Sequence, residues 1–244
     1  MSAHIEEESQ AHQATGVAIG ADLGVRKLAT CSDETVYENP KALKTQQKKI
    51  TRLQRQLQRQ QRGSNRKEVT RKKLARAKMK EANIRKDAIH KATTAITAKT
   101  KPSSERPYVI GIEDLNVRGM LKCRRKARSI QDMGFGEFRR QLTYKKDWYG
   151  NELYVADRFY PSSKTCSKCG HVKQDLKDDD YIYVCDECGL VIDRDLNAAI
   201  NLKNLAVSST ERINGRGGDV RPLESERQTP EKRQSGEMAH LSSF

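Results

Sequence analysis

The sequence lacks long apolar runs and is poor in aromatic residues. No stretch reaches the roughly 18 consecutive apolar residues of a membrane helix, so we expect no membrane span and no membrane partner. Aromatic residues make up 5% of the 244 residues, which implies a modest core. Residues 1–13 include Glu6, Glu7 and Glu8 and no apolar core, so they do not resemble a signal peptide. We therefore expect a cytoplasmic protein.

Basic residues outnumber acidic ones, giving a formal net charge of +15. Such an excess points to a polyanionic partner, nucleic acid before membrane. Residues 41–101 contain 21 Lys and Arg against three acids, so this segment carries the whole excess. Apolar spacing predicts helices over 41–62 and 68–99, with a break at Gly63–Asn65. The prediction is a basic helical hairpin that binds nucleic acid, with these candidate contacts: Arg71, Lys72, Lys73, Arg76, Arg85 and Lys86.

Three apolar runs are typical of buried strands. They cover residues 17–22, 108–114 and 152–160, and a further strand is expected over 26–33, in a hairpin-like arrangement with the first. We expect a helix from Phe135 to about Trp148 with Phe135, Phe138 and Leu142 on one face. We also expect a helix over 193–206, and these residues are predicted to face inward: Leu196, Ala199, Ile200 and Leu205. Residues 122–130 read as a basic loop, and residues 1–14 and 207–244 as disordered.

Four of the six cysteines form two C-x-x-C pairs, Cys166/Cys169 and Cys185/Cys188, with 15 residues between them and a glycine after each. Two such turns can close a tetrahedral shell of four thiolates, which fits a structural zinc ion. Disulfides or a redox pair are the alternatives, and a reducing compartment disfavours them. The single cysteines Cys31 and Cys123 are predicted to be ordinary core or loop residues.

Three carboxylates stand at the boundaries of the predicted elements. Asp22 ends the first predicted strand, and Glu113 ends the strand predicted in the second apolar run. Asp195 begins the last predicted helix. Carboxylates held together can bind two Mg²⁺ ions roughly 3.5–4 Å apart, an arrangement that hydrolyses phosphodiesters. Each acid could equally be a helix cap or a surface residue. Spacing alone does not separate Glu113 from Asp114, or Asp195 from Asp193.

The sequence resembles the TnpB family of insertion-sequence nucleases, which are related to type V CRISPR effectors. The resemblance rests on "GADLGVRKLAT" (20–30), "ANIRKDAIHK" (82–91), "GIEDLNVRGM" (111–120) and the cysteine region ending in "DRDLNAAINLKNL" (193–205), and it covers roughly residues 16–206. One departure is Ala21, where the family usually has Ile. Family members also carry roughly half their chain before the first motif, whereas about 15 residues precede it here.

The resemblance implies an α/β fold, with an RNase H-like (RuvC) mixed sheet and flanking helices. The core would span 15–160 and 190–206, with the basic hairpin 41–101 inserted and a four-cysteine zinc ribbon at 161–189. It also implies that Asp22, Glu113 and Asp195 are the catalytic, magnesium-binding residues and that the four paired cysteines bind zinc. The partners would be DNA and a guide RNA from the transposon end, because guided effectors select their targets by base pairing.

Three functions remain open from the sequence. The first is a magnesium-dependent DNA endonuclease, which the intact carboxylate motifs favour. The second is a truncated module that binds nucleic acid without cutting it, which the short segment before the first motif favours. The third is a structural role in a larger assembly.

Overall fold

A mixed five-stranded sheet forms the centre of the protein. The computed structural model describes residues 18–97, 108–177 and 180–215. The sheet order is β3-β2-β1-β4-β5. β1 pairs antiparallel with β2, and β2 with β3, whereas β1, β4 and β5 run parallel. The strands are β1 (Ala18–Asp22), β2 (Lys27–Cys31), β3 (Val36–Glu38), β4 (Val109–Glu113) and β5 (Glu152–Ala156). The prediction of an α/β protein with a mixed sheet is confirmed.

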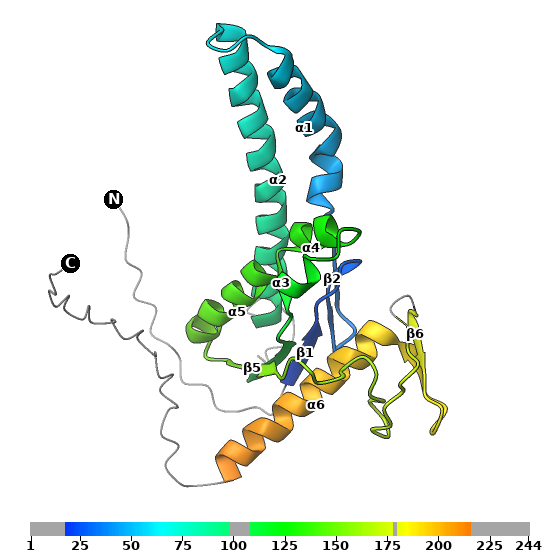
Figure 1. Ribbon diagram of the computed structural model, residues 1–244. Helices are drawn as coiled ribbons and strands as arrows, with labels where there is room; N and C mark the ends of the chain where they lie inside the picture. The colour runs from blue at the N-terminus through cyan, green and yellow to red at the C-terminus, as the bar shows by residue number, and fades with distance from the viewer. Residues whose placement is uncertain (1–17, 98–107, 178–179, 216–244) are drawn as a thin grey trace, which may run out of the picture.

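Helices cover both faces of this sheet (Figure 1). Because side chains alternate along a strand, Ile19 and Ala21 of β1 face one side, where they join the main core with Ile89 and Phe138. That side is covered by the second half of α2 (Asn65–Thr97) and by α5 (Phe135–Tyr149). The opposite side is covered by α6 (Arg194–Gly215), which contacts β1 and β4. The first four residues of β1 and of β4 are thus buried, as their apolar runs predict, whereas the edge strand β5 is exposed or half-buried until Ala156.

The contact between α6 and the sheet is made by backbone atoms. A Cβ added to Gly20 of β1 would lie 1.9 Å from the carbonyl oxygen of Ala199, and one added to Gly111 of β4 would lie 2.5 Å from that of Leu202. Only glycine fits at either position. Each glycine stands two residues before a predicted catalytic acid, on the same face of its strand.

This close approach corrects the predicted inward face of α6. Ala199 is buried as expected, but Leu196, Ile200 and Leu205 are only half-buried. The other buried residues of the helix are instead Ala198, Leu202 and Ala206, together with Asn197 and Asn201. Ala199 and Leu202 meet the strand glycines through their backbone carbonyls. The helix also continues to Gly215, so the prediction of disorder from residue 207 is wrong over 207–215. The predictions for 1–14 and for 216–244 lie outside the described residues.

The two predicted basic helices form a hairpin that projects from the sheet (Figure 1). α1 (Ala42–Arg59) packs on the first half of α2 through a small apolar cluster consisting of Ile50, Leu53, Leu74 and Ala77. The second half of α2 turns a different face to the main core through Ile89, Ala92 and Ile96. Other apolar residues of this half, Ile84, Ala88 and Ala95, are only half-buried. One helix of 33 residues therefore belongs to two cores.

Residues 122–130, predicted as a basic loop, are helical from Ala127 on, so that prediction is wrong over 127–130. A short helix also precedes the segment. α3 (Val117–Met120) begins with the Asn116 side chain accepting a hydrogen bond from the Gly119 amide. α4 (Ala127–Met133) buries Ile130 and Met133 in the main core. Apolar residues three apart outweigh the basic composition there, because they place one helical face on the core.

The remaining differences are short strands. β3 was not expected, and neither was the two-stranded sheet of β6 (Ile182–Val184) and β7 (Val191–Asp193). β5 ends at Ala156, whereas the apolar run was predicted to continue as a strand to 160. In α5 the predicted face of Phe135, Phe138 and Leu142 is buried. Among the described residues, no helix is both long and apolar enough to cross a membrane.

We expect Gly20→Ala to lower the free energy of unfolding by about 3 kcal/mol or more, the upper end for an overpacked core, because the new methyl group would collide with backbone. Gly136→Ala is the matched control. Its Cβ would meet nothing within 4 Å on α5, so we expect it to be neutral or to stabilise by up to about 1 kcal/mol. Urea unfolding of both variants measures the difference. Equal stability of the two would contradict backbone contact between α6 and β1.

Candidate nuclease centre and metal site

Two of the three candidate carboxylates lie at the ends of neighbouring parallel strands. The register pairs Ala21 of β1 with Ile112 of β4, so Asp22 and Glu113 follow directly at the same edge of the sheet. Strand ends of one direction meet at one edge, which is where α/β proteins place their sites. The sheet topology therefore brings together two acids that are about ninety residues apart in the chain.

The third carboxylate comes from the first turn of α6. Asp193 caps this helix, because its Oδ1 accepts hydrogen bonds from the amides of Asp195 (2.9 Å) and Leu196 (3.1 Å). The cap places Asp195 close enough to act on Asp22. Burial raises the pKa of Asp22 well above its usual value, and the charges of Glu113 and Asp195 raise it further. The three acids thus belong to one electrostatic site.

Glu113 is held by a residue that the sequence analysis did not single out. The Ser162 hydroxyl donates a hydrogen bond to Glu113 Oε1. Burial raises the pKa of Glu113, while this hydrogen bond and the charge of Arg194 act in the opposite direction. No spacing rule would have found Ser162, because it lies 49 residues from Glu113.

The structure gives the neighbouring acids other partners. Asp114 forms ion pairs with Arg139 and Arg158, and the hydrogen bond from Arg158 is the main cause that lowers its pKa. Asp193 caps α6 and pairs with Lys27 at 3.1 Å. The negative charges of Asp114 and Asp193 are therefore already balanced by cations or by backbone amides. Asp22 and Glu113 instead carry raised pKa values, as expected for carboxylates that divalent cations would stabilise.

The two kinds of predicted metal site differ in compactness. Within the described residues, the four paired cysteines are the one group of three or more metal-ligand side chains that lies close enough to share an ion. The carboxylates Asp22, Glu113 and Asp195 do not meet that spacing. Carboxylate oxygens are donors that fit magnesium. The three carboxylates are nevertheless spaced more widely than the cysteines, as expected for acids that repel one another.

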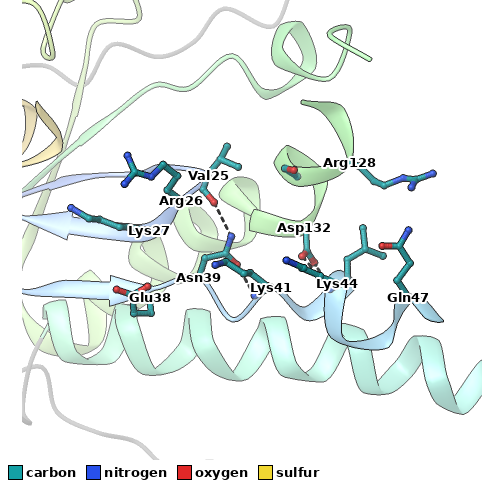
Figure 2. A pocket seen from close by; sticks show the side chains of 12 residues that line it. Val25, Arg26, Lys27, Glu38, Asn39, Lys41, Lys44, Gln47, Arg128 and Asp132 are labelled. Atoms are coloured by element: carbon teal, nitrogen blue, oxygen red, sulfur yellow. Dashed lines mark hydrogen bonds between the residues drawn. The ribbon is translucent and has the colours of Figure 1, made fainter. Parts of the chain in front are cut away.

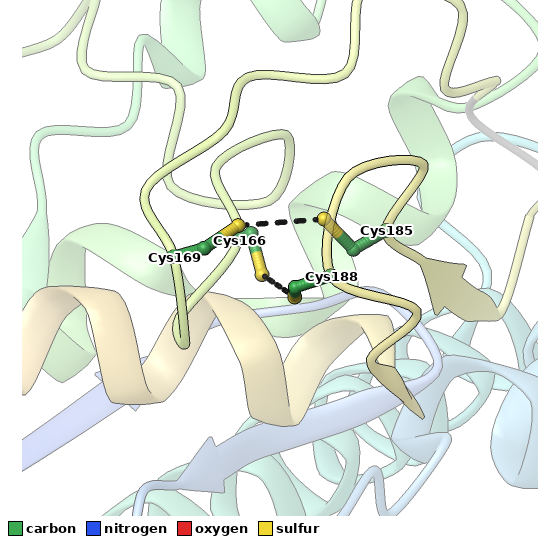
Figure 3. Close-up of side chains that lie close together, drawn as sticks. All are labelled: Cys166, Cys169, Cys185 and Cys188. Carbon is green, nitrogen blue, oxygen red and sulfur yellow. Dashed lines mark hydrogen bonds between the residues drawn. The ribbon is translucent and has the colours of Figure 1, made fainter.

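The four cysteines point toward one centre from two hairpin turns (Figure 3). Their sulfur atoms all lie within 4.8 Å of one another. Cys166 Sγ is 3.6 Å from Cys188 Sγ, and Cys169 Sγ is 3.6 Å from Cys185 Sγ. A disulfide would need about 2.05 Å, so the disulfide alternative does not describe this arrangement. The cluster fits zinc binding.

Each turn has the same backbone design. The amide of Gly170 donates to the Cys166 carbonyl, and the amide of Gly189 donates to the Cys185 carbonyl. Both glycines adopt positive φ, 78° and 67°, which tightens the turn under the sulfurs. Hydrogen bonds from the amides of Cys188 and Glu187 lower the pKa of Cys185 to about 6. This shift favours a thiolate at Cys185, whereas burial and the neighbouring sulfurs raise the pKa of Cys169.

Two asparagines of α6 connect this cysteine cluster to the carboxylates. Asn197 accepts a hydrogen bond from the Ser167 amide (3.0 Å) and donates to the Thr165 carbonyl (2.7 Å). Asn201 donates to the carbonyls of Thr165 (2.6 Å) and Ser162 (2.8 Å). Both asparagines are buried. They fix a loop, residues 162–167, that holds Ser162 at one end and Cys166 near the other; we call it the junction loop.

The predicted nucleic-acid contacts lie on α2, and their surroundings differ. Lys72, Lys73, Arg76 and Lys86 are exposed. Arg71 is exposed and pairs with Glu68. Arg85 is half-buried and pairs with Glu81 (2.8 Å) and Asp132 (3.2 Å), so it is engaged within the fold.

Asn197→Ala should lower the free energy of unfolding by about 1–3 kcal/mol, because it leaves the buried Thr165 carbonyl and Ser167 amide with fewer partners. The control is Asn204→Ala, an exposed asparagine of the same helix, which should change stability by less than about 0.5 kcal/mol. Thermal unfolding followed by circular dichroism compares the two. If Asn197→Ala were as stable as the control, the junction loop would not depend on this clamp.

Comparison with known proteins places these features in a family. The OrfB_IS605 family model, described as a probable transposase, matches residues 2–124, and the Cas12f1-like TNB domain model matches residues 135–202. A structure of Cas12f1 in a complex with sgRNA and target DNA has a similar fold, with a TM-score of 0.54 and 20% identity. The likeness covers 78% of this chain and 50% of that one.

Two curated relatives are provisionally named as RNA-guided DNA endonucleases. The protein of Streptomyces pristinaespiralis is 36% identical over 189 residues, 78% of this chain and 45% of the relative. InsQ of Escherichia coli K12 is 38% identical over 199 residues, 75% of this chain and 48% of the relative. The chain thus spans about half the length of these relatives. With a family model matched over half its length, the chain belongs to the TnpB family.

Proposed function

We propose that this chain is the nuclease part of an RNA-guided DNA endonuclease, with Asp22, Glu113 and Asp195 as its magnesium-binding catalytic residues. The observation that carries the proposal is the meeting of the ends of β1 and β4 with the start of α6, which joins three distant carboxylates electrostatically. The names of the curated relatives support the same activity. The proposed chemistry is hydrolysis of DNA phosphodiester bonds.

The proposed core is RNase H-like, of the RuvC type. An antiparallel β3-β2-β1 unit followed by the parallel strands β4 and β5 supports this assignment, as does the fold likeness to Cas12f1. The domain division proposed from the sequence accords with the element order. The hairpin of α1 and α2 is inserted between β3 and β4, and the cysteine turns are inserted between β5 and α6.

Each residue of the proposed centre has a distinct task. When bound, magnesium would supply an activated water and stabilise the leaving oxygen of the phosphodiester. Asp22 and Glu113 provide ligands from rigid strand ends, and Ser162 orients the Glu113 carboxylate. Lys27 Nζ lies 3.9 Å from Asp195 Oδ2 and offsets part of the negative charge. Because preorganised charge lowers a barrier only when its geometry is fixed, the close packing of α6 serves the reaction directly.

The proposed partners are DNA and a guide RNA from the transposon end. The Cas12f1 likeness is to a protein complexed with both kinds of molecule. The basic hairpin, with the exposed residues of α2 already named, supplies positive charge for phosphate groups. Zinc at the four cysteines would be structural, since four thiolates leave no open position for a substrate.

Neutralising the proposed catalytic residues should abolish magnesium-dependent cutting of single-stranded DNA. We expect Asp22→Ala, Glu113→Gln and Asp195→Ala each to reduce the rate by at least about a hundredfold, as loss of a preorganised charge does. Folding should be retained, because removing a repelling carboxylate does not weaken the metal-free site. A gel assay with and without added guide RNA measures the rate.

Asp114→Asn and Asp193→Asn are the controls for this test. Both acids are neighbours of the proposed ligands but have other partners, and Asn keeps the capping ability of residue 193. Both variants should retain activity. Cutting that survives all three triad substitutions would show that the triad is wrong. If the wild type cuts nothing, the module that binds without cutting becomes the better description.

The protein should contain one zinc ion per chain, bound by Cys166, Cys169, Cys185 and Cys188. Removing it should unfold the cysteine turns, because metal binding supplies the local folding energy of such small units. Elemental analysis of freshly purified protein measures the content, and amide hydrogen exchange after chelation measures the unfolding. Protein purified without chelators and free of zinc would refute the assignment.

A further inference from the structure

A basic pocket lies beside the carboxylates, at the foot of the hairpin. Its volume is about 640 Å³, and its walls come from the turn before β2, the end of β3, the start of α1 and from α4. Figure 2 shows side chains from these separate elements gathered around it. Five of the lining residues are basic: Arg26, Lys27, Lys41, Lys44 and Arg128. None of these residues belongs to the contacts predicted from the sequence.

The two acids in this pocket do little to cancel that charge. Asp132 already accepts hydrogen bonds from the Leu43 amide, at 3.1 Å to each oxygen, and from Arg85 at 3.2 Å. The negative charge of Asp132 therefore stabilises the amides at the start of α1. It is also offset by Arg85, which does not line the pocket. The other acid, Glu38, lines the pocket together with five basic residues. The pocket consequently has a net positive charge.

The rim of the pocket is held in a fixed conformation. The side chain of Asn39 donates to the Val25 carbonyl (2.8 Å) and accepts from the Lys41 amide (2.8 Å). Lys41 has φ 47° and ψ 45°, the left-handed region that L residues seldom occupy. A backbone strained in this way persists only where its surroundings impose it, and such positions gather at binding sites.

A second groove continues the basic surface along α1. It has a volume of about 900 Å³, and Lys44 and Gln47 line both spaces. Its lining includes five basic residues and no acid, and the basic residues are Lys44, Lys48, Arg52, Arg55 and Arg59. They recur at intervals of three or four, which places them on one face of the helix. A continuous basic track thus runs from the foot of the hairpin toward its tip.

The lower end of the track reaches the proposed nuclease centre. Lys27 lines the pocket and also lies 3.1 Å from Asp193 Oδ2 and 3.9 Å from Asp195 Oδ2. The neighbouring Arg26 stacks on Tyr181 at 3.7 Å, which ties the same wall to the cysteine region. A phosphate chain bound in the pocket would therefore continue directly to the carboxylates.

We propose that this track binds the phosphate backbone of the DNA strand that leads to the cutting site. The inference rests on the proposed function, and it adds which surface receives the substrate and from which direction. A surface in which cations outnumber acids suits a polyanion, since each neutralised phosphate releases counterions. The direct connection to Asp195 through Lys27 favours the strand to be cut over a guide held elsewhere.

The test compares three charge-matched pairs of substitutions. Lys44→Gln with Arg128→Gln alters the pocket, and Arg52→Gln with Arg55→Gln alters the groove along α1. The control, Lys91→Gln with Arg140→Gln, removes the same charge from exposed ion pairs on α2 and α5. Binding of labelled single-stranded DNA is measured by fluorescence anisotropy in EDTA across a range of salt concentrations. Circular dichroism confirms that each variant is folded.

We expect both track variants to weaken DNA binding by on the order of tenfold at about 0.1 M salt, and to reduce the salt slope by about 1.4 for two lost phosphate contacts. The control should bind as the wild type does. Unchanged binding by the track variants, or equal loss by the control, would overturn the proposal. So would a loss seen with RNA of the same sequence but not with DNA. Because EDTA removes cutting from the measurement, a failure of the catalytic assignment would leave this result standing.

Discussion

The contact on which the site depends is that of α6 with the backbones of β1 and β4. Gly20 and Gly111 allow the helix to approach so closely that a methyl group would collide with its carbonyl oxygens. The same two strands end in Asp22 and Glu113, and the same helix begins beside Asp195. The relative position of the three carboxylates is therefore set by packed main chain, which moves less than side chains do. A centre that works through charge and geometry needs such a frame.

The junction loop connects the cysteine region directly to the proposed nuclease centre. Asn197 and Asn201 of α6 donate hydrogen bonds to carbonyls of this loop, and Ser162 of the loop donates a hydrogen bond to Glu113. A metal ion in the cysteine cluster would stabilise the loop at Cys166, four residues from Ser162. The two candidate metal sites are thus connected through this loop, although they are proposed to bind different ions and only one is proposed to perform chemistry. Ligands alone are an incomplete description of either site.

Local patterns in the sequence predicted the elements well where one periodicity dominates. The strands ending at Asp22 and Glu113, the two basic helices and the apolar face of α5 all follow from the spacing of apolar residues. The cysteine cluster follows from its two C-x-x-C pairs. The inward face of α6 was mispredicted because only apolar residues were assumed to be buried, whereas the buried positions include Asn197 and Asn201. α4 was missed because the prediction weighed the basic composition of its segment above the spacing of Ile130 and Met133.

The site residues that were missed share a physical reason. Ser162, Asn197 and Lys27 act through partners that are distant in the chain, so no spacing identifies them. The choices left open, between Glu113 and Asp114 and between Asp195 and Asp193, needed the ion pairs and the helix cap that only the fold reveals. The motif resemblance had pointed to the same members of each pair. The raised pKa of Glu113, the ion pairs of Asp114 and the capping role of Asp193 support this assignment, which stays a proposal.

The length of α2 has a mechanical consequence. Its 33 residues form one helix without a break, about 50 Å from end to end at 1.5 Å per residue. Its far half stands away from the sheet, and its near half is anchored in the main core, where the buried ammonium of Lys145 donates hydrogen bonds to Thr93 and Thr94. The helix is therefore a rigid rod that joins the hairpin tip to the main core, in which residues of β1 and β4 also lie. A displacement of the tip would be transmitted to the core beside the strands that end in Asp22 and Glu113.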